Sequence, residues 1–292
     1  MNTSNKTFLF VFFMVISMII WGGSWVSAKA IAETLPPETL TFWRFIITFI
    51  SLAPILLFLK EPVRLNRHGL VYTILGSVFM GLYLYVFFKG LTYGFAGAAG
   101  VLVTTMIPII TFALSVLFFR RNISARDFLG LTLGVIGGGI LLQVWTLDAN
   151  KIFMHGNLYF LLGAVLWALL TICSQKSGSS ISPLFFNLFT SGFCAVLFFF
   201  LCLAHGTLSI AGQDNLFWFN MIYLSVISSG LATTVYFFAS NRLGSHRASS
   251  FVFLVPSSAV VFSWFFLGEQ PRVSTIVGGL TAIIAVYLIN VK

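Results

Sequence analysis

Apolar segments long enough to cross a lipid bilayer follow one another along almost the whole chain, and they limit its fold more than any other feature. The clearest runs from Ala96 to Phe119 without a charged residue. About 20 apolar residues cross the hydrocarbon core as a helix, and lipid offers no partner to an open backbone. Only 8% of the residues are charged and 59% are hydrophobic, whereas about a quarter are charged in soluble domains. An all-α polytopic membrane protein is therefore predicted.

Charged residues, glycine and proline divide these segments into ten predicted transmembrane helices joined by connectors too short for a soluble domain. The apolar run after Lys6 continues past Trp21 without a small-residue cleavage pattern, so we interpret it as a retained first span and not as a signal peptide. The predicted spans are residues 8–30, 38–59, 69–90, 96–119, 126–144, 156–176, 183–204, 216–240, 247–267 and 273–291.

Lysine and arginine are distributed unequally between alternate connectors. One side holds eleven of the sixteen cations, and the other holds two, Lys151 and Arg272. Cytoplasmic connectors are the ones enriched in these residues, so both termini are predicted to be cytoplasmic. One missed or extra span would destroy the asymmetry, which therefore supports ten spans. The eleven are Lys6, Lys60, Arg64, Arg67, Arg120, Arg121, Arg126, Lys176, Arg242, Arg247 and Lys292.

Features of the first half return in the second half at nearly constant spacing. Pro108 lies in the middle of one span and Pro256, 148 residues later, in the middle of another. Trp21 and Trp167 are 146 residues apart. Two five-helix repeats, residues 1–146 and 147–292, are therefore predicted, and five spans each force the repeats to insert in opposite directions. Inverted repeats around a site near the bilayer midplane recur in secondary transporters.

Four segments carry a family resemblance: IIWGGSWVSAK at 19–29, PPETLTFWRF at 36–45, FFKGLTYGFAGAAG at 87–100 and FLGEQP at 266–271. In this order they resemble the EamA branch of the drug/metabolite transporter superfamily, and the likeness covers essentially the whole chain. The resemblance implies a ten-helix carrier of the bacterial inner (plasma) membrane, most often an exporter of amino acids or other small metabolites. It also maps a shared tryptophan, lysine and arginine to Trp21, Lys29 and Arg44. The chain departs from the pattern at Arg120-Arg121, where the second half has Gly268-Glu269.

Three cations, Lys29, Arg44 and Lys89, fall within predicted spans. Intramembrane ionisable residues are costly, so each is a candidate for the substrate pathway. Arg44 is the deepest, whereas Lys29 and Lys89 lie close enough to span ends to reach the interface. The hypothesis from these residues is an anionic group bound among the three cations, with Glu33 as a candidate partner of Arg44.

Aromatic and hydroxyl side chains at helical spacing are predicted to complete the pathway. Two sets share one helix face each: Trp167, Thr171 and Gln175 in the sixth span, and Ser229, Thr233 and Tyr236 in the eighth. For any single hydroxyl, satisfying nearby backbone is the competing interpretation. The remaining predicted pathway residues are Trp25, Tyr85 and Thr104.

Pro108 and Pro256 are predicted to kink their helices and act as gates, because proline removes a backbone hydrogen bond. Gly130, Gly134 and Gly138 form a stripe that allows close helix contact, either within one subunit or in a homodimer.

Other functional classes find little support in the residues. The cations lie in short connectors and do not form the clustered face that nucleic acid requires. The seven carboxylates lie in connectors or at span ends, which disfavours a proton relay through buried acids. We identify no catalytic constellation, metal-ligand cluster or cofactor motif, so neither an enzyme nor a bound metal or cofactor is expected. Cys173, Cys194 and Cys202 are interpreted as buried thiols.

The sequence thus predicts a secondary transporter for a small metabolite, an amino acid or related organic anion or zwitterion, working by alternating access. Two alternatives stay open. An obligate exchanger importing a phosphorylated or nucleotide-like metabolite would also suit the three cations. A membrane-embedded enzyme or assembly factor that transports nothing is the alternative from another class, since fold does not dictate function.

Overall fold

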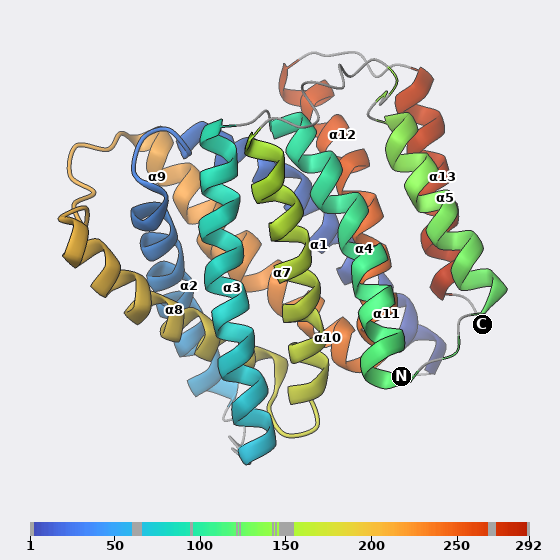
Figure 1. Ribbon diagram of the computed structural model, residues 1–292, viewed down its shortest axis with the longest axis horizontal. Coiled ribbons are helices and arrows are strands. Elements are labelled where there is room, and N and C mark those ends of the chain that lie inside the picture. Colours follow the sequence, from blue (N-terminus) through green and yellow to red (C-terminus); the bar gives the residue numbers. More distant parts are fainter. Residues whose placement is uncertain are drawn as a thin grey trace.

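All regular structure in the described residues is helical, and no strand occurs among them. Figure 1 shows the helices packed side by side as one bundle. The predicted all-α class is confirmed. The computed structural model describes residues 3–59, 66–93, 96–120, 122, 124–141, 143, 145, 155–267 and 273–290.

The helices begin and end close to the boundaries that charge, glycine and proline predict. In chain order they are α1 (Thr3–Ile31), α2 (Pro37–Leu59), α3 (Arg67–Tyr93), α4 (Ala96–Phe119), α5 (Ala125–Leu141), α7 (His155–Ser177), α8 (Pro183–His205), α9 (Asn215–Ile222), η2 (Tyr223–Ala232), α10 (Thr233–Leu243), α11 (Ser245–Ser250), η3 (Phe251–Leu254), α12 (Val255–Leu267) and α13 (Val273–Asn290).

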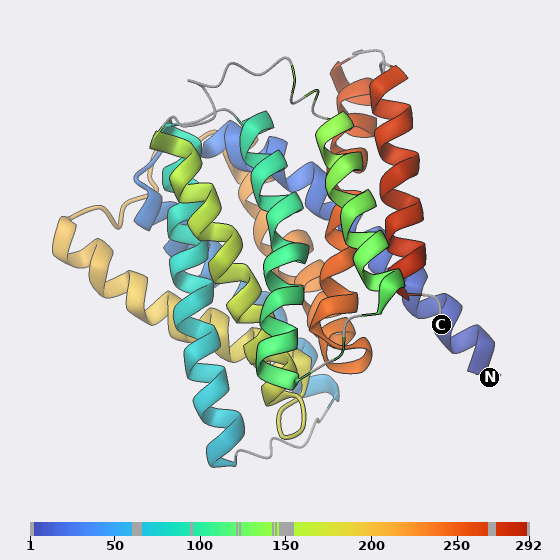
Figure 2. The same ribbon diagram turned by 45° about the vertical axis from the view of Figure 1, so that its right-hand side comes forward.

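Helix α8 shows how local chemistry sets these bounds. The Ser182 hydroxyl accepts a hydrogen bond from the Phe185 amide, and Pro183 occupies the first turn, where a missing N–H costs nothing. The helix ends at His205, and the next residue, Gly206, has a left-handed φ of 67°, which suits glycine. In Figures 1 and 2, α8 runs obliquely and leaves the bundle on one side.

Six helical stretches of the described residues are long and apolar enough to cross a membrane. Two shorter apolar helices, Val103–Phe119 and Ile276–Asn290, accompany them. The six are Leu9–Ile31, Pro37–Leu59, Arg67–Tyr93, Leu158–Ser177, Pro183–His205 and Asn215–Leu243.

Two of the predicted spans change helix type along their length. The eighth contains a ten-residue π-helix, η2, between α9 and α10. The ninth is interrupted by the 3-10 turn η3, which ends one residue before α12 and two before Pro256. In contrast, α4 is an α-helix throughout and contains Pro108 in its interior. The two prolines that the repeat relates therefore lie in different local structures.

The glycine stripe of α5 packs against neighbours within the chain. A Cβ atom added at Gly130 would lie 2.5 Å from Ile289, and one at Gly134 would lie 2.4 Å from the Phe253 ring. One added at Gly138 would lie 2.9 Å from the Thr105 hydroxyl. The stripe thus brings α5 against α13, η3 and α4, and this packing lends no support to the homodimer predicted through these glycines.

Helix pairs in the bundle join segments from the two halves of the chain. Helix α2 packs on α8, α5 on α13, and α3 and α4 on α7. Helix α1 crosses the bundle obliquely and packs on η2 and α12 (Figure 2). Cys173, Cys194 and Cys202 are free and buried in this packing, as predicted.

Candidate functional site

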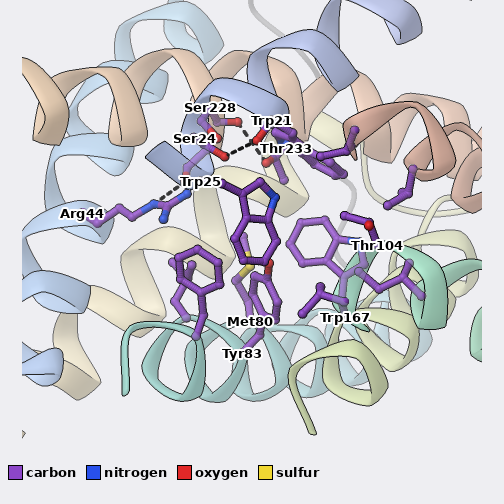
Figure 3. A pocket seen from close by; sticks show the side chains of 17 residues that line it. Trp21, Ser24, Trp25, Arg44, Met80, Tyr83, Thr104, Trp167, Ser228 and Thr233 are labelled. Carbon is purple, nitrogen blue, oxygen red and sulfur yellow. Dashed lines mark hydrogen bonds between the residues drawn. The ribbon is translucent and has the colours of Figure 1, made fainter. Parts of the chain in front are cut away.

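A small cavity of about 50 Å³ lies where helices of both halves meet. It has room for a few water molecules and lies well below the 300 Å³ of a typical small-molecule pocket, so any larger ligand requires the helices to separate. Seven of the predicted pathway residues line it: Trp21, Trp25, Arg44, Thr104, Trp167, Ser229 and Thr233. Figure 3 shows their side chains converging from several helices.

Tryptophan and tyrosine rings form one wall of the cavity. The rings of Trp21 and Trp167, the pair that the repeat relates, meet edge to face with centroids 5.0 Å apart. Tyr83 packs on Trp167 at 4.7 Å, and Tyr236, which is absent from the residues that line the cavity, packs on both tryptophans. Such pairs favour this edge-on geometry because the ring edge is positive and the face is negative. The wall is therefore apolar and presents ring faces and edges to a ligand.

Arg44 is the one charged side chain among the described residues that line the cavity. It is only 6% exposed. Its Nε donates a hydrogen bond of 2.9 Å to the Ser229 hydroxyl, and its guanidinium lies 5.9 Å from the Phe88 ring centroid. No carboxylate of the described residues forms a salt bridge with it, and its two terminal nitrogens make no hydrogen bond to them. A buried charge without a charged partner is costly, so an anion in the cavity would relieve that cost.

Lys29 and Lys89 do not line the cavity with Arg44. Lys29 donates hydrogen bonds to the Glu33 carboxylate at 2.7 Å and to the carbonyl of Leu91 at 3.0 Å. The expected partner of Arg44, Glu33, is therefore bound to Lys29 instead. The hydrogen bond and the charge of Lys29 lower the pKa of the Glu33 carboxyl. The pair joins the last turn of α1 to the turn that follows it, four residues along the chain.

Lys89 lies among tyrosine rings at the end of α3. Its ammonium lies 5.6 Å from the ring centroids of both Tyr85 and Tyr159. Tyr85 also packs on Phe198 and is absent from the residues that line the cavity. The anion site with three cations thus reduces, in this structure, to Arg44.

The remaining predicted residues lie around the cavity or away from it. The Thr171 hydroxyl is 3.0 Å from the hydroxyl of Tyr236, and neither residue is among those that line the cavity. Gln175 lies farther along α7, where its Oε1 accepts a hydrogen bond of 2.7 Å from the Ser245 amide. Gln175 therefore holds the start of α11 and does not face the cavity.

Sequence reasoning missed several side chains that line the cavity. Ser24, Met80, Tyr83 and Ser228 are among them. A serine or tyrosine in an apolar helix is common, so residue type alone did not separate these from packing residues. The π-helix η2 was also missed, although it places Ser228 and Ser229 at the cavity.

Comparisons with known proteins agree with a transporter. The chain matches the EamA-like transporter family twice, over residues 8–143 and 154–291. It is 24% identical to an uncharacterized transporter, YoaV, of Bacillus subtilis, over 92% of both chains. It is 26% identical to an uncharacterized transporter of Archaeoglobus fulgidus over 99% of both chains.

Similarity also extends to a plant protein and to a solved structure. A WAT1-related protein of Arabidopsis thaliana is 24% identical, over 94% of this chain and 85% of its own length. A solved crystal structure superposes with a TM-score of 0.73 at 16% identity and 94% coverage of both chains, which shows a shared fold. With two family matches that together cover most of the sequence, the chain belongs to the EamA-like transporter family and is a multi-pass membrane protein.

Proposed function

We propose that the chain is a secondary transporter that moves a small organic anion or zwitterion, such as an amino acid, out across the bacterial inner membrane by alternating access. Ten spans form two inverted repeats, residues 1–146 and 147–292, and both termini lie in the cytoplasm. The cargo binds in the cavity between the repeats, where its anionic group meets Arg44 and its body meets the tryptophan and tyrosine rings.

The observation that carries this proposal is the buried guanidinium of Arg44, which forms no salt bridge with a described carboxylate, in a cavity lined from both halves. Each half contributes one of the two facing tryptophans, Trp21 and Trp167. A cavity of about 50 Å³ fits a contracted state between loading steps. Substrate would enter when one group of helices moves against the other, as in other carriers built from inverted repeats.

The charge in the cavity favours a cargo with one negative charge. A single guanidinium neutralises one carboxylate through two parallel hydrogen bonds. A phosphorylated cargo brings about two negative charges, and the described lining residues offer no second cation. The exchanger that imports phosphorylated metabolites is therefore the weaker candidate.

Transport by the purified full-length protein in proteoliposomes tests the proposal. A panel of radiolabelled amino acids, monocarboxylates and phosphorylated metabolites would be measured with and without a pH gradient. We expect uptake or efflux of one class with a single carboxylate, and its loss in Arg44→Gln. Arg67→Gln is the matched control, because Arg67 is an exposed arginine at the start of α3.

Two results would contradict parts of the proposal. If Arg44→Gln transports every anionic substrate with unchanged affinity, Arg44 does not bind the cargo. If transport appears only when substrate is also present inside the vesicles, the protein is an obligate exchanger.

A further inference from the structure

The π-helix η2 is held in place by side chains of two neighbouring helices. From α2, the Thr48 hydroxyl lies 2.9 Å from the carbonyl of Ser225. From α8, Asn187 reaches the carbonyls of Ser229 and Gly230. Most π-helical segments are single turns, and they occur often at functional sites. A segment of ten residues at the cavity therefore needs a physical explanation.

Asn187 supplies hydrogen-bond donors to backbone carbonyls of this segment. The side chain is fully buried, and its amide nitrogen lies 2.8 Å from the Ser229 carbonyl and 2.8 Å from the Thr234 hydroxyl. Thr234 in turn donates to the Gly230 carbonyl at 2.6 Å. Carbonyl oxygens only accept hydrogen bonds, which fixes the orientation of the amide group. Asn187 thus binds the Ser229 carbonyl directly, and it binds the Gly230 carbonyl both directly, at 3.3 Å, and through Thr234.

Ser229 connects Asn187 to the arginine of the cavity. Its carbonyl accepts from Asn187, and its hydroxyl accepts from Arg44 Nε at 2.9 Å. In a π-helix, as in an α-helix, a carbonyl can also bond an amide of its own helix, so the bond from Asn187 is an additional contact that holds the Ser229 carbonyl towards α8. Moving the segment by one residue between π and α registers would rotate its side chains by roughly 100°. The Ser229 hydroxyl would then leave Arg44.

We propose that Asn187 is a positioning residue of the transport site, which keeps η2 in its π register and thereby holds the Ser229 hydroxyl against Arg44. The effect on cargo binding rests on the function proposed above, whereas the effect on η2 does not. Asn187 does not touch the cargo in this arrangement. It acts through Ser229.

The test compares Asn187→Leu, which keeps the size of the side chain but removes both donors, with Thr190→Val as a matched control. Thr190 is equally buried one turn along α8, and its hydroxyl bonds only within that helix, to the carbonyl of Asn187. Hydrogen exchange read by mass spectrometry would follow the amides of residues 223–234 in the full-length protein in lipid nanodiscs. We expect faster exchange there in Asn187→Leu and unchanged exchange in Thr190→Val. Unchanged exchange in both would overturn the proposal.

Calorimetric titration with benzoate, a monoanionic probe, measures how Asn187→Leu changes anion binding at Arg44. Loss of one oriented hydrogen bond predicts affinity about tenfold weaker in Asn187→Leu. In a Ser229→Ala background, Asn187→Leu should weaken binding no further, because the group through which it acts is gone. Additive losses in this double-mutant cycle would show that Asn187 serves general packing and would overturn the proposal.

Failure of this proposal can be distinguished from misfolding of the variant and from failure of the proposed anion site. If Asn187→Leu does not fold, Thr234→Val removes the hydroxyl that carries the second contact while keeping the shape, and the same exchange pattern is expected. If benzoate does not bind the wild-type protein, the anion site proposed for Arg44 is contradicted. The exchange comparison then still decides whether Asn187 holds η2.

Discussion

Arg44 brings a positive charge into a mostly apolar cavity lining, and among the described residues it donates one hydrogen bond, to the neutral hydroxyl of Ser229. An arginine keeps its charge even when buried, and its planar fork suits a carboxylate. Its side chain also contacts the Phe88 ring, which restricts where the guanidinium points. At the scale of single residues, Arg44 can therefore contribute to anion binding in two ways, through its charge and through the planar shape of its guanidinium.

Arg44→Lys separates charge from shape. The ammonium of lysine keeps the charge, but it cannot bond Ser229 through Nε while presenting two parallel donors. We expect benzoate affinity to fall about tenfold in Arg44→Lys, equivalent to the loss of one hydrogen bond, and to fall below detection in Arg44→Gln. Calorimetric titration measures both. Wild-type affinity in Arg44→Lys would show that charge alone recognises the probe.

The pair of Lys29 and Glu33 predicts a specific dependence of stability on pH. Lys29 lowers the pKa of Glu33 in the folded protein. A carboxyl whose folded pKa is lowered stabilises the protein above its ordinary pKa, and the contribution is lost as the pH falls through the lowered value. The thermal midpoint should therefore drop slightly less in Glu33→Gln than in the wild type between pH 7 and pH 3. The difference should be small, because both side chains are solvent-accessible.

Residue types predicted some members of the site and failed for others for physical reasons. Arg44 stood out because ionisable groups are rare in spans, and Trp21 and Trp167 stood out because the repeat relates them. Asn187 did not stand out in the sequence, since a neutral amide in an apolar helix often only hydrogen-bonds a neighbouring helix. The expected contact between Glu33 and Arg44 was wrong, because the local spacing of four residues joins Glu33 to Lys29 first.

At the scale of helices, α5 packs so closely on α13 and on η3 that glycine is required at the contacts. The space beside Gly134 is filled by the Phe253 ring, whereas the atoms nearest a Cβ at Gly163 of α7 are 3.6 Å away, in ordinary contact. The glycine pattern in the sequence predicted close packing but did not identify the partner. Which helix packs against the glycine stripe depends on the arrangement of the whole bundle.

Alanine at these two glycines should have opposite effects. Gly134→Ala forces the Phe253 ring to move, and overpacking of this kind costs about 1–3 kcal/mol. Gly163→Ala places its methyl group in ordinary van der Waals contact with Tyr83, at 3.6 Å, and alanine favours a helix over glycine by about 1 kcal/mol. Thermal denaturation of the purified protein in lipid nanodiscs measures the difference. Equal effects at both positions would show that Phe253 does not pack on Gly134 as described.

The change of helix type in η2 lay beyond prediction from periodicity. Its sequence, Tyr223–Ala232, reads as an ordinary apolar segment with three serines. The π register depends on donors from other helices, Thr48 and Asn187, that lie far away in the sequence. Structure of this kind follows from tertiary contacts and not from local preference.

At the scale of the whole molecule, the helix contacts follow the pairing that two related halves would produce. The second and seventh predicted spans, α2 and α8, pack on each other, as do the fifth and tenth, α5 and α13. The third span packs on the sixth, and the eighth, through η2, packs on the first. Exchanging the halves converts the first two of these contacts into themselves and each of the last two into the other. This pattern supports the proposal of two repeats. The start of α1 and the end of α13 lie at the same end of the bundle (Figures 1 and 2), which fits an even number of spans.

The direction of insertion can be tested at the two ends of α8. Ser179 and Ser209 are both exposed and lie in connectors on either side of this helix. If the excess of lysine and arginine marks the cytoplasm, Ser209 faces the outside and Ser179 faces the inside. An impermeant maleimide added to intact cells should label Ser209→Cys and leave Ser179→Cys unlabelled until the cells are opened. The native cysteines Cys173, Cys194 and Cys202 are buried, so the unsubstituted protein serves as the background control. Labelling of Ser179→Cys in intact cells would reverse the orientation, and a cargo entering from the cytoplasm would then meet the opposite end of the cavity.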